Sequence, residues 1–140
     1  MRISEQEQFH ELSYYTLGHP DKKYFIHQHI VDAYTVQNAD KDIKPIAITF
    51  SLVGLCLFIE KNYSGREVQL VHMQMAKNKK AWSAFILPEQ RGEIRISDVL
   101  AASQGKERDL MIKRWCTSVW QAYSDCHVTI ETIIRSYKIK

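Results

Sequence analysis

The chain has 140 residues, of which 45% are hydrophobic and 25% charged, and its formal net charge is +3. These values are typical of a soluble globular protein, and the length suits a single domain over residues 1–140. The positive charge is weak and scattered, so it does not by itself indicate a protein that binds nucleic acid.

The three cysteines, Cys56, Cys116 and Cys126, have no paired spacing, which excludes a CxxC metal or redox motif. Free buried thiols fit a reducing compartment. The polar N-terminal stretch lacks the apolar core of a signal peptide, and the longest apolar run, residues 46–59, is too short to span a bilayer. We therefore expect a cytoplasmic protein that does not enter a membrane.

Two capping boxes mark helix starts along the chain. Ser4 with Glu7 opens the first helix, and Ser64 with Glu67 opens a later one. Proline and glycine, together with the spacing of apolar residues, give the other boundaries. The expected helices cover residues 4–17, 20–38, 45–62, 65–78, 97–103 and 107–137.

Residues 81–92 lack a helical period and are expected to form an extended loop. The last helix is the longest, and a break near Ser124 and Asp125 stays open because both residues are weak helix formers. The sequence therefore predicts an all-α fold: a single compact helical bundle of about five or six helices with a long C-terminal helix.

The stretch from Tyr24 to Asn38 sets several polar side chains inside a hydrophobic pattern. His29 and Asp32 are three residues apart on the expected helix, so the carboxylate could contact and orient the imidazole. Two interpretations stay open: buried hydrogen bonds between helices, or a catalytic or metal site. The candidate polar site consists of His27, His29, Asp32, Tyr34, Gln37 and His127.

Histidines occur on several different expected helices, and helical bundles commonly build metal sites from facing helices. Three nitrogen ligands and one carboxylate would leave an open position for water on a divalent metal such as zinc. The sequence has no H-E-x-x-H motif and no glycine-rich phosphate loop. The candidate metal ligands are His27, Asp32, His127, His10 and His72.

Four stretches carry a resemblance to a known family: FHELSYYTLGHPDKKYFIHQHIVDAYTVQNA, KPIAITFSLVGLCLFIEKNYSGREVQ, RGEIRISDVL and RWCTSVWQAY. Together they resemble a family of small uncharacterised bacterial all-helical proteins, a domain of unknown function. The resemblance implies no activity, but it favours His27, Asp32 and His127 among the polar candidates. The positions that match the family pattern are His27, Asp32, Ala33, Tyr34, Gln37, Gly92, Val99, Trp115, Val119, Trp120 and His127.

Three functional hypotheses follow from the sequence, and whether the protein is an enzyme stays open. The first is a module that binds a protein partner or associates as a homo-oligomer without catalysis, based on aromatic residues near segment ends, such as Tyr14, Tyr15, Tyr63 and Trp82. The alternative is a divalent-metal-binding bundle with hydrolase or transferase activity on a small molecule, in which Asp32 or Glu11 would be the base. Nucleic-acid binding ranks last.

Overall fold

The computed structural model describes residues 4–77, 82 and 84–137. Within this part of the chain the fold is entirely helical, with seven α-helices and one short 3-10 helix, which confirms the predicted all-α bundle. The elements are α1 (Glu5–Leu17), α2 (His27–Gln37), α3 (Pro45–Lys61), α4 (Gly65–Ala76), α5 (Ile96–Ala101), α6 (Lys106–Ala122), η1 (Ser124–Cys126) and α7 (His127–Ser136).

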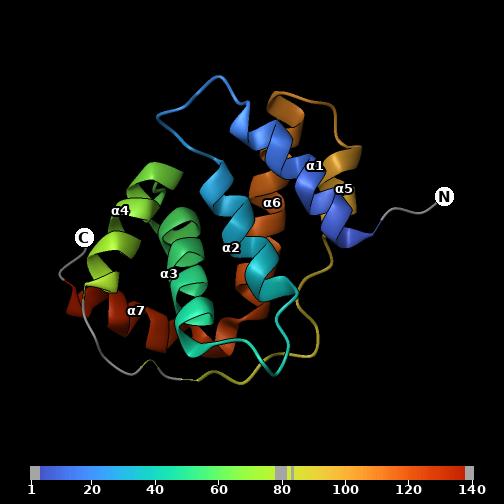
Figure 1. Cartoon of the computed structure of the whole chain (residues 1–140). Coiled ribbons are helices and arrows are strands. Elements are labelled where there is room, and N and C mark those ends of the chain that lie inside the picture. The colour runs from blue at the N-terminus through green and yellow to red at the C-terminus, as the bar shows by residue number, and fades with distance from the viewer. Residues whose placement is uncertain (1–3, 78–81, 83, 138–140) are drawn as a thin grey trace.

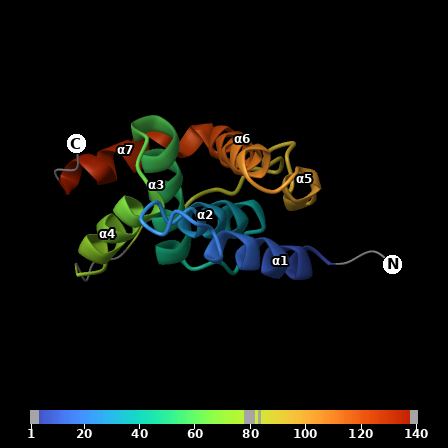
Figure 2. The ribbon, with the colours of Figure 1, turned by 90° about the horizontal axis from the view of Figure 1, so that it is seen from above.

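Helix α3 lies at the centre of the bundle and packs against α2, α4, α6 and α7 (Figure 1). Seen from above, α1, α2 and α4 form one layer, while α6 and α7 form a second layer on the other side of the molecule (Figure 2). Helix α1 lies at the opposite end of the first layer from α4 (Figures 1 and 2). Side chains on α1 are therefore well separated from those on α4.

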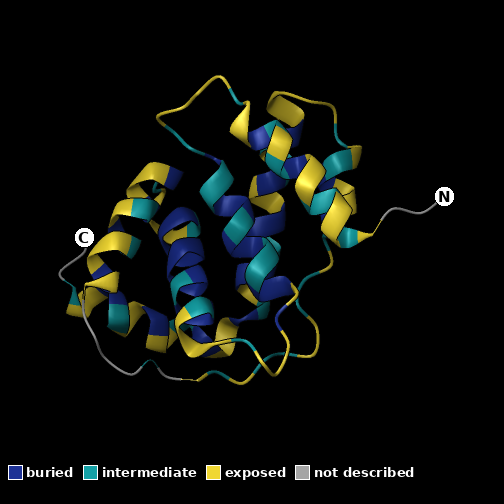
Figure 3. Ribbon diagram, in the orientation of Figure 1, coloured by how far each residue is buried: buried dark blue, intermediate teal, exposed yellow. Residues whose placement is uncertain are grey.

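The core follows the apolar sequence pattern. Residues 51–58 of α3 are all buried, as expected for a helix covered on several sides (Figure 3). Ile26, just before α2, and Ile30, Ala33 and Gln37 on α2 share one face at helical spacing, and all four are buried. In the described part of the chain, no helix is both long and apolar enough to cross a bilayer.

Both predicted helix starts are capped by a serine, and the capping box is complete at Ser64. Ser4 Oγ accepts a hydrogen bond from Glu7 N at 3.1 Å, and α1 begins at the next residue. Ser64 Oγ accepts from Glu67 N at 3.1 Å, while Ser64 N donates to Glu67 Oε1 at 3.0 Å. Each cap satisfies backbone donors that a helix start would otherwise leave unpaired.

The second helix is shorter than predicted, because α2 begins at His27 and not near residue 20. The preceding connection, residues 18–26, is irregular: Asp21 Oδ1 accepts a hydrogen bond from Tyr24 N at 2.9 Å. Phe25 then takes a positive φ of 54°, which no helical residue can adopt. The prediction of a helix over residues 20–26 was therefore wrong.

The connection is held against α4 by a close approach at Gly65. A Cβ atom at this position would overlap the carbonyl oxygen of Phe25, so only glycine fits here. Arg66 N also donates to Tyr24 O at 3.2 Å, and the Arg66 guanidinium lies 5.4 Å from the centroid of the Phe25 ring. The strained Phe25 conformation is thus fixed by contacts with the start of α4.

The predicted C-terminal helix over residues 107–137 is divided into α6 and α7 by η1. The break falls at Ser124 and Asp125, where the sequence left it open. The His127 ring bonds the Trp120 carbonyl at 2.8 Å, which gives that carbonyl near the end of α6 a partner. The chain therefore changes direction after α6, and α7 runs beneath α3 (Figure 1).

Candidate functional site

Asp32 lies in the core, where its carboxyl group packs against α3. Its Oδ1 accepts a hydrogen bond from Gln28 Nε2 at 3.1 Å, while Oδ2 is buried without a hydrogen-bond partner. A Cβ atom on Gly54 would overlap Oδ2 and lie 3.2 Å from Val68 Cγ1. Burial raises the pKa of Asp32 well above its usual value, with the Gln28 hydrogen bond opposing that shift. Asp32 is thus held as a neutral acid in a space that exists because residue 54 has no side chain.

His29 is fully buried but does not pair with Asp32, so the predicted contact between them was wrong. Its ring stacks on Phe58 with the centroids 3.6 Å apart, and the Tyr24 ring meets it edge-on at 5.6 Å. Both ring nitrogens are buried without a hydrogen-bond partner, and burial lowers the His29 pKa to about 3. The aromatic neighbours turn the imidazole away from the carboxyl, and His29 acts as a flat core side chain.

His27 and Tyr34, half-buried on α2, both contact α1. His27 Nδ1 lies 2.9 Å from Thr16 Oγ1, whose single hydrogen is donated to Ser13 O at 3.1 Å. Nδ1 therefore carries the proton, and burial lowers the pKa of His27. The Tyr34 ring stacks on Phe9 of α1 at 4.2 Å. Both residues fasten α1 to α2.

Gln37, at the end of α2, uses its whole side-chain amide. Its Nε2 donates to Ile94 O at 2.8 Å and to Arg91 O at 3.2 Å, while Oε1 accepts from Trp115 Nε1 at 2.8 Å. Arg91 in turn donates to the carbonyls of Gln37 and Ala39. This buried network joins three parts of the chain: α2, the segment that precedes α5, and helix α6. It fits the first of the two interpretations that the sequence left open, buried hydrogen bonds between helices.

His127 stacks on Trp120 with the ring centroids 3.7 Å apart, in addition to its bond to the Trp120 carbonyl. Trp120 Nε1 donates to Glu60 Oε1 at 3.2 Å, which links the pair to the end of α3. His127 therefore holds the turn between α6 and α7 in place and lies at the far end of α6 from the start of α2.

The candidate metal ligands come from separated helices. His10 is exposed on α1, and His72 on α4 bonds Phe50 O at 2.7 Å through Nε2. Neither is brought together with His27, Asp32 or His127. Within residues 4–77, 82 and 84–137, no group of three or more His, Cys, Asp or Glu side chains is arranged to hold a metal ion.

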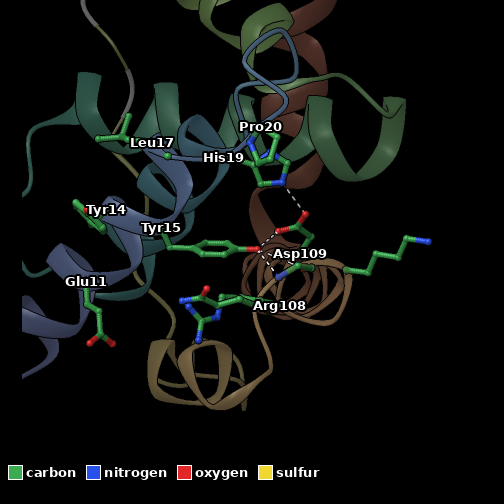
Figure 4. Close-up of a pocket in the computed structure, with 12 residues that line it drawn as sticks. Glu11, Tyr14, Tyr15, Leu17, His19, Pro20, Arg108 and Asp109 are labelled. Atoms are coloured by element: carbon green, nitrogen blue, oxygen red, sulfur yellow. Dashed lines mark hydrogen bonds and ion pairs between the residues drawn. The ribbon is translucent and has the colours of Figure 1, made fainter.

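The structure reveals a cleft that the sequence did not single out. It has a volume of about 1100 Å³ and lies between the end of α1, the turn at residues 18–20 and the segment 104–109. Asp109 Oδ1 accepts from Tyr15 OH at 2.7 Å and Oδ2 from His19 Nε2 at 2.7 Å, and both bonds appear in Figure 4. His19 Nδ1 accepts from Asp21 N at 3.0 Å, so the ring proton lies on Nε2.

The cleft is braced from below by Arg108, which is almost fully buried. Its Nε donates to Ala102 O at 3.2 Å and its terminal nitrogen to Leu100 O at 2.8 Å, which satisfies carbonyls at the end of α5. The guanidinium also lies 4.8 Å from the Tyr15 ring centroid. On the α1 side of the cleft, Glu11 and Tyr14 point away from this framework (Figure 4).

A family model matches residues 6–124, which is most of the chain. The chain belongs to DUF5946, a family of unknown function. This assignment confirms the resemblance to a domain of unknown function. No curated protein and no solved structure matches the chain at a significant level.

In this DUF5946 chain, several positions of the predicted family pattern make structural contacts. Gly92 has a φ of 99°, and a Cβ there would lie 2.6 Å from Ser118 Oγ on α6. Trp115, Val119 and Trp120 are buried on α6. Together with the contacts of Gln37 and His127, these positions account for how the helices of this DUF5946 chain are joined.

Asp32→Asn should stabilise this DUF5946 chain at neutral pH. The unfolded chain ionises Asp32 above pH about 4, while burial raises the pKa in the folded chain, so the folded chain keeps the proton to a higher pH. Between these two pKa values, this group makes the free energy of unfolding fall as pH rises. The slope is at most about 1.4 kcal/mol per pH unit. Asparagine does not ionise, so the variant lacks this pH dependence. Urea denaturation between pH 4 and 8 should show that the variant's free energy of unfolding exceeds that of the wild type by an amount that grows with pH. Asp125→Asn, at an exposed site, is the control; an advantage that does not change with pH would contradict the buried neutral acid.

Proposed function

We propose that the protein acts by binding another polypeptide, either a partner protein or a second copy of itself, and not by catalysis. The proposed binding surface is the cleft between α1 and the start of α6. Its volume is about 1100 Å³. This is the first hypothesis drawn from the sequence, a protein-binding or self-associating module, now with a named binding surface.

The observation that supports it most strongly is the exposure of Tyr14 and Leu17 on the cleft lining. Tyr14 is 85% exposed and Leu17 is 52% exposed, and they lie three residues apart on one face of α1. Exposed tyrosines next to a hollow are typical of binding surfaces, because a rigid aromatic ring buries much area at low entropic cost. Neither side chain contributes to the core.

The cleft floor supports binding because it is already rigid. Tyr15, His19 and Asp109 satisfy one another through hydrogen bonds, and Arg108 is fixed by two carbonyls. A preorganised surface loses little conformational entropy when a partner binds. These bonds engage both oxygens of Asp109 and Nε2 of His19, and His19 Nδ1 accepts from Asp21 N. These groups therefore serve as framework and not as a free base and its activator.

Site-specific photo-crosslinking tests the proposal. Tyr14 is replaced by p-benzoylphenylalanine in the full chain, expressed in cells of the source organism, and adducts are identified by mass spectrometry. The control carries the same group at Val128, which is 74% exposed on α7. We expect one defined adduct at Tyr14, with another protein or with this chain, that is absent at Val128. No adduct at Tyr14, or the same adducts at both positions, would contradict the proposal.

A further inference from the structure

A second hollow adjoins the cleft, and its lining differs in character. Its volume is about 400 Å³, within the range of small-molecule sites. His19 and Asp109 line both hollows. The second hollow lies between the 18–26 connection and α6, with Phe58 at the end of α3 as a further wall.

The walls of this hollow are apolar and aromatic, and they are fixed from behind. Tyr24, Ile26 and Phe58 line it together with Leu110. The buried His29 ring stacks on Phe58 and meets the Tyr24 ring edge-on, so both aromatic walls are packed against the same core side chain. Ile26 is itself part of the core. An apolar group could enter this hollow without the walls having to rearrange.

The hollow carries charges of both signs, since Asp21 and Asp109 also line it. Their oxygens accept hydrogen bonds from the protein's own donors: Asp21 Oδ1 from Tyr24 N, and the two oxygens of Asp109 from Tyr15 and His19. Lys106 and Lys113 also line it, and among the described residues neither ammonium group has an ion-pair partner. The two lysines are seven residues apart on α6, so they lie on one face, about 10 Å apart along the axis, with Leu110 between them.

From this arrangement we infer that the hollow is a binding site for a small organic anion: a carboxylate or phosphate carried on an aromatic or aliphatic body. The body would lie against Tyr24 and Leu110, beside the buried edge of Phe58, and the anionic group would accept hydrogen bonds from Lys106 and Lys113. This site goes beyond the proposed polypeptide-binding function and does not depend on it.

Titration of the purified full chain, followed by ¹H–¹⁵N NMR at low salt, tests this site. The ligands are indole-3-acetate, which carries a carboxylate, and phenyl phosphate, each at up to about 10 mM. Their neutral counterparts are indole-3-acetamide and phenol. We expect saturable shifts at Tyr24, Phe58 and Leu110 with at least one anion, and binding at least about tenfold weaker for its neutral counterpart. Which anion binds identifies the preferred head group.

Two variants separate the site from nonspecific attraction of anions. The Lys106→Met/Lys113→Met variant should bind the anion about tenfold more weakly, since methionine keeps the length but removes the charge. The matched control, Lys41→Met/Lys77→Met, removes two exposed lysines elsewhere and should bind as the wild type does. Three results would each overturn the inference: no saturable binding of either anion, equal binding of the neutral counterpart, or equal loss in both double variants.

Discussion

Gly54→Ala should lower the free energy of unfolding by about 3 kcal/mol, because the core has no space for one more methyl group. The new Cβ would overlap Asp32 Oδ2 and press on Val68 Cγ1 at 3.2 Å. Both neighbours are buried, and α2 and α4 would have to move away from α3 to make room. Urea denaturation of the purified chain measures the loss.

Removing the Asp32 carboxyl checks whether the overlap with Oδ2 causes the loss of stability. In an Asp32→Ala background, Gly54→Ala should cost much less than it does in the wild type, since the overlapping carboxyl is gone. Gly18→Ala is the matched control, because a Cβ there meets the carbonyl oxygens of Tyr14 at 3.4 Å and Tyr15 at 3.8 Å, which are ordinary contacts. Equal costs of Gly54→Ala in both backgrounds would show that the Asp32 contact is not the reason.

Gln37→Ala should also cost about 3 kcal/mol, from three hydrogen bonds worth about 1 kcal/mol each. The truncation leaves Trp115 Nε1 and the carbonyls of Arg91 and Ile94 without their partner at the junction of α2 and α6. Chemical denaturation followed by tryptophan fluorescence measures the change.

The neighbouring Asn38→Ala is the control for Gln37. Asn38 is exposed, and its side chain donates to Tyr34 O at 3.1 Å and accepts a long bond from Arg95 at 3.4 Å. Because both bonds are open to solvent, their loss should change stability by at most about 0.5 kcal/mol. If both variants were equally mild, Gln37 would not be the residue that joins the two helices.

The helices were predictable where local chemistry decides them. Three helix starts follow from local signals: the serine caps at Ser4 and Ser64 and the proline at residue 45. The spacing of apolar residues gives the buried faces of the helices. The 18–26 connection was not predictable, because its path depends on Phe25 meeting Gly65, forty residues later. Helical periodicity cannot reveal a positive φ that a distant segment imposes.

The candidate site was predictable in its burial but not in its contacts. Spacing places Asp32 and Gln37 on the inner faces of α2, and both are buried. Spacing does not give side-chain direction. The His29 ring turns toward Phe58, and the neighbours of the Asp32 carboxyl are instead Gln28 and Gly54. The His19–Asp109 pair joins residues ninety positions apart, so no local pattern could reveal it.

The histidines in the described part of the chain serve as structural side chains, which supports the proposal of a protein that works by binding. Elemental analysis can test their role on protein purified without a histidine tag or chelator and then incubated with zinc, iron, nickel and manganese. Because His27 and His127 are bonded to Thr16 and Trp120 in separate parts of the fold, we expect well under one equivalent of any metal per chain. One equivalent that is retained through dialysis and lost in the His27→Ala/His127→Ala variant would contradict this structural role and favour a metal-dependent activity.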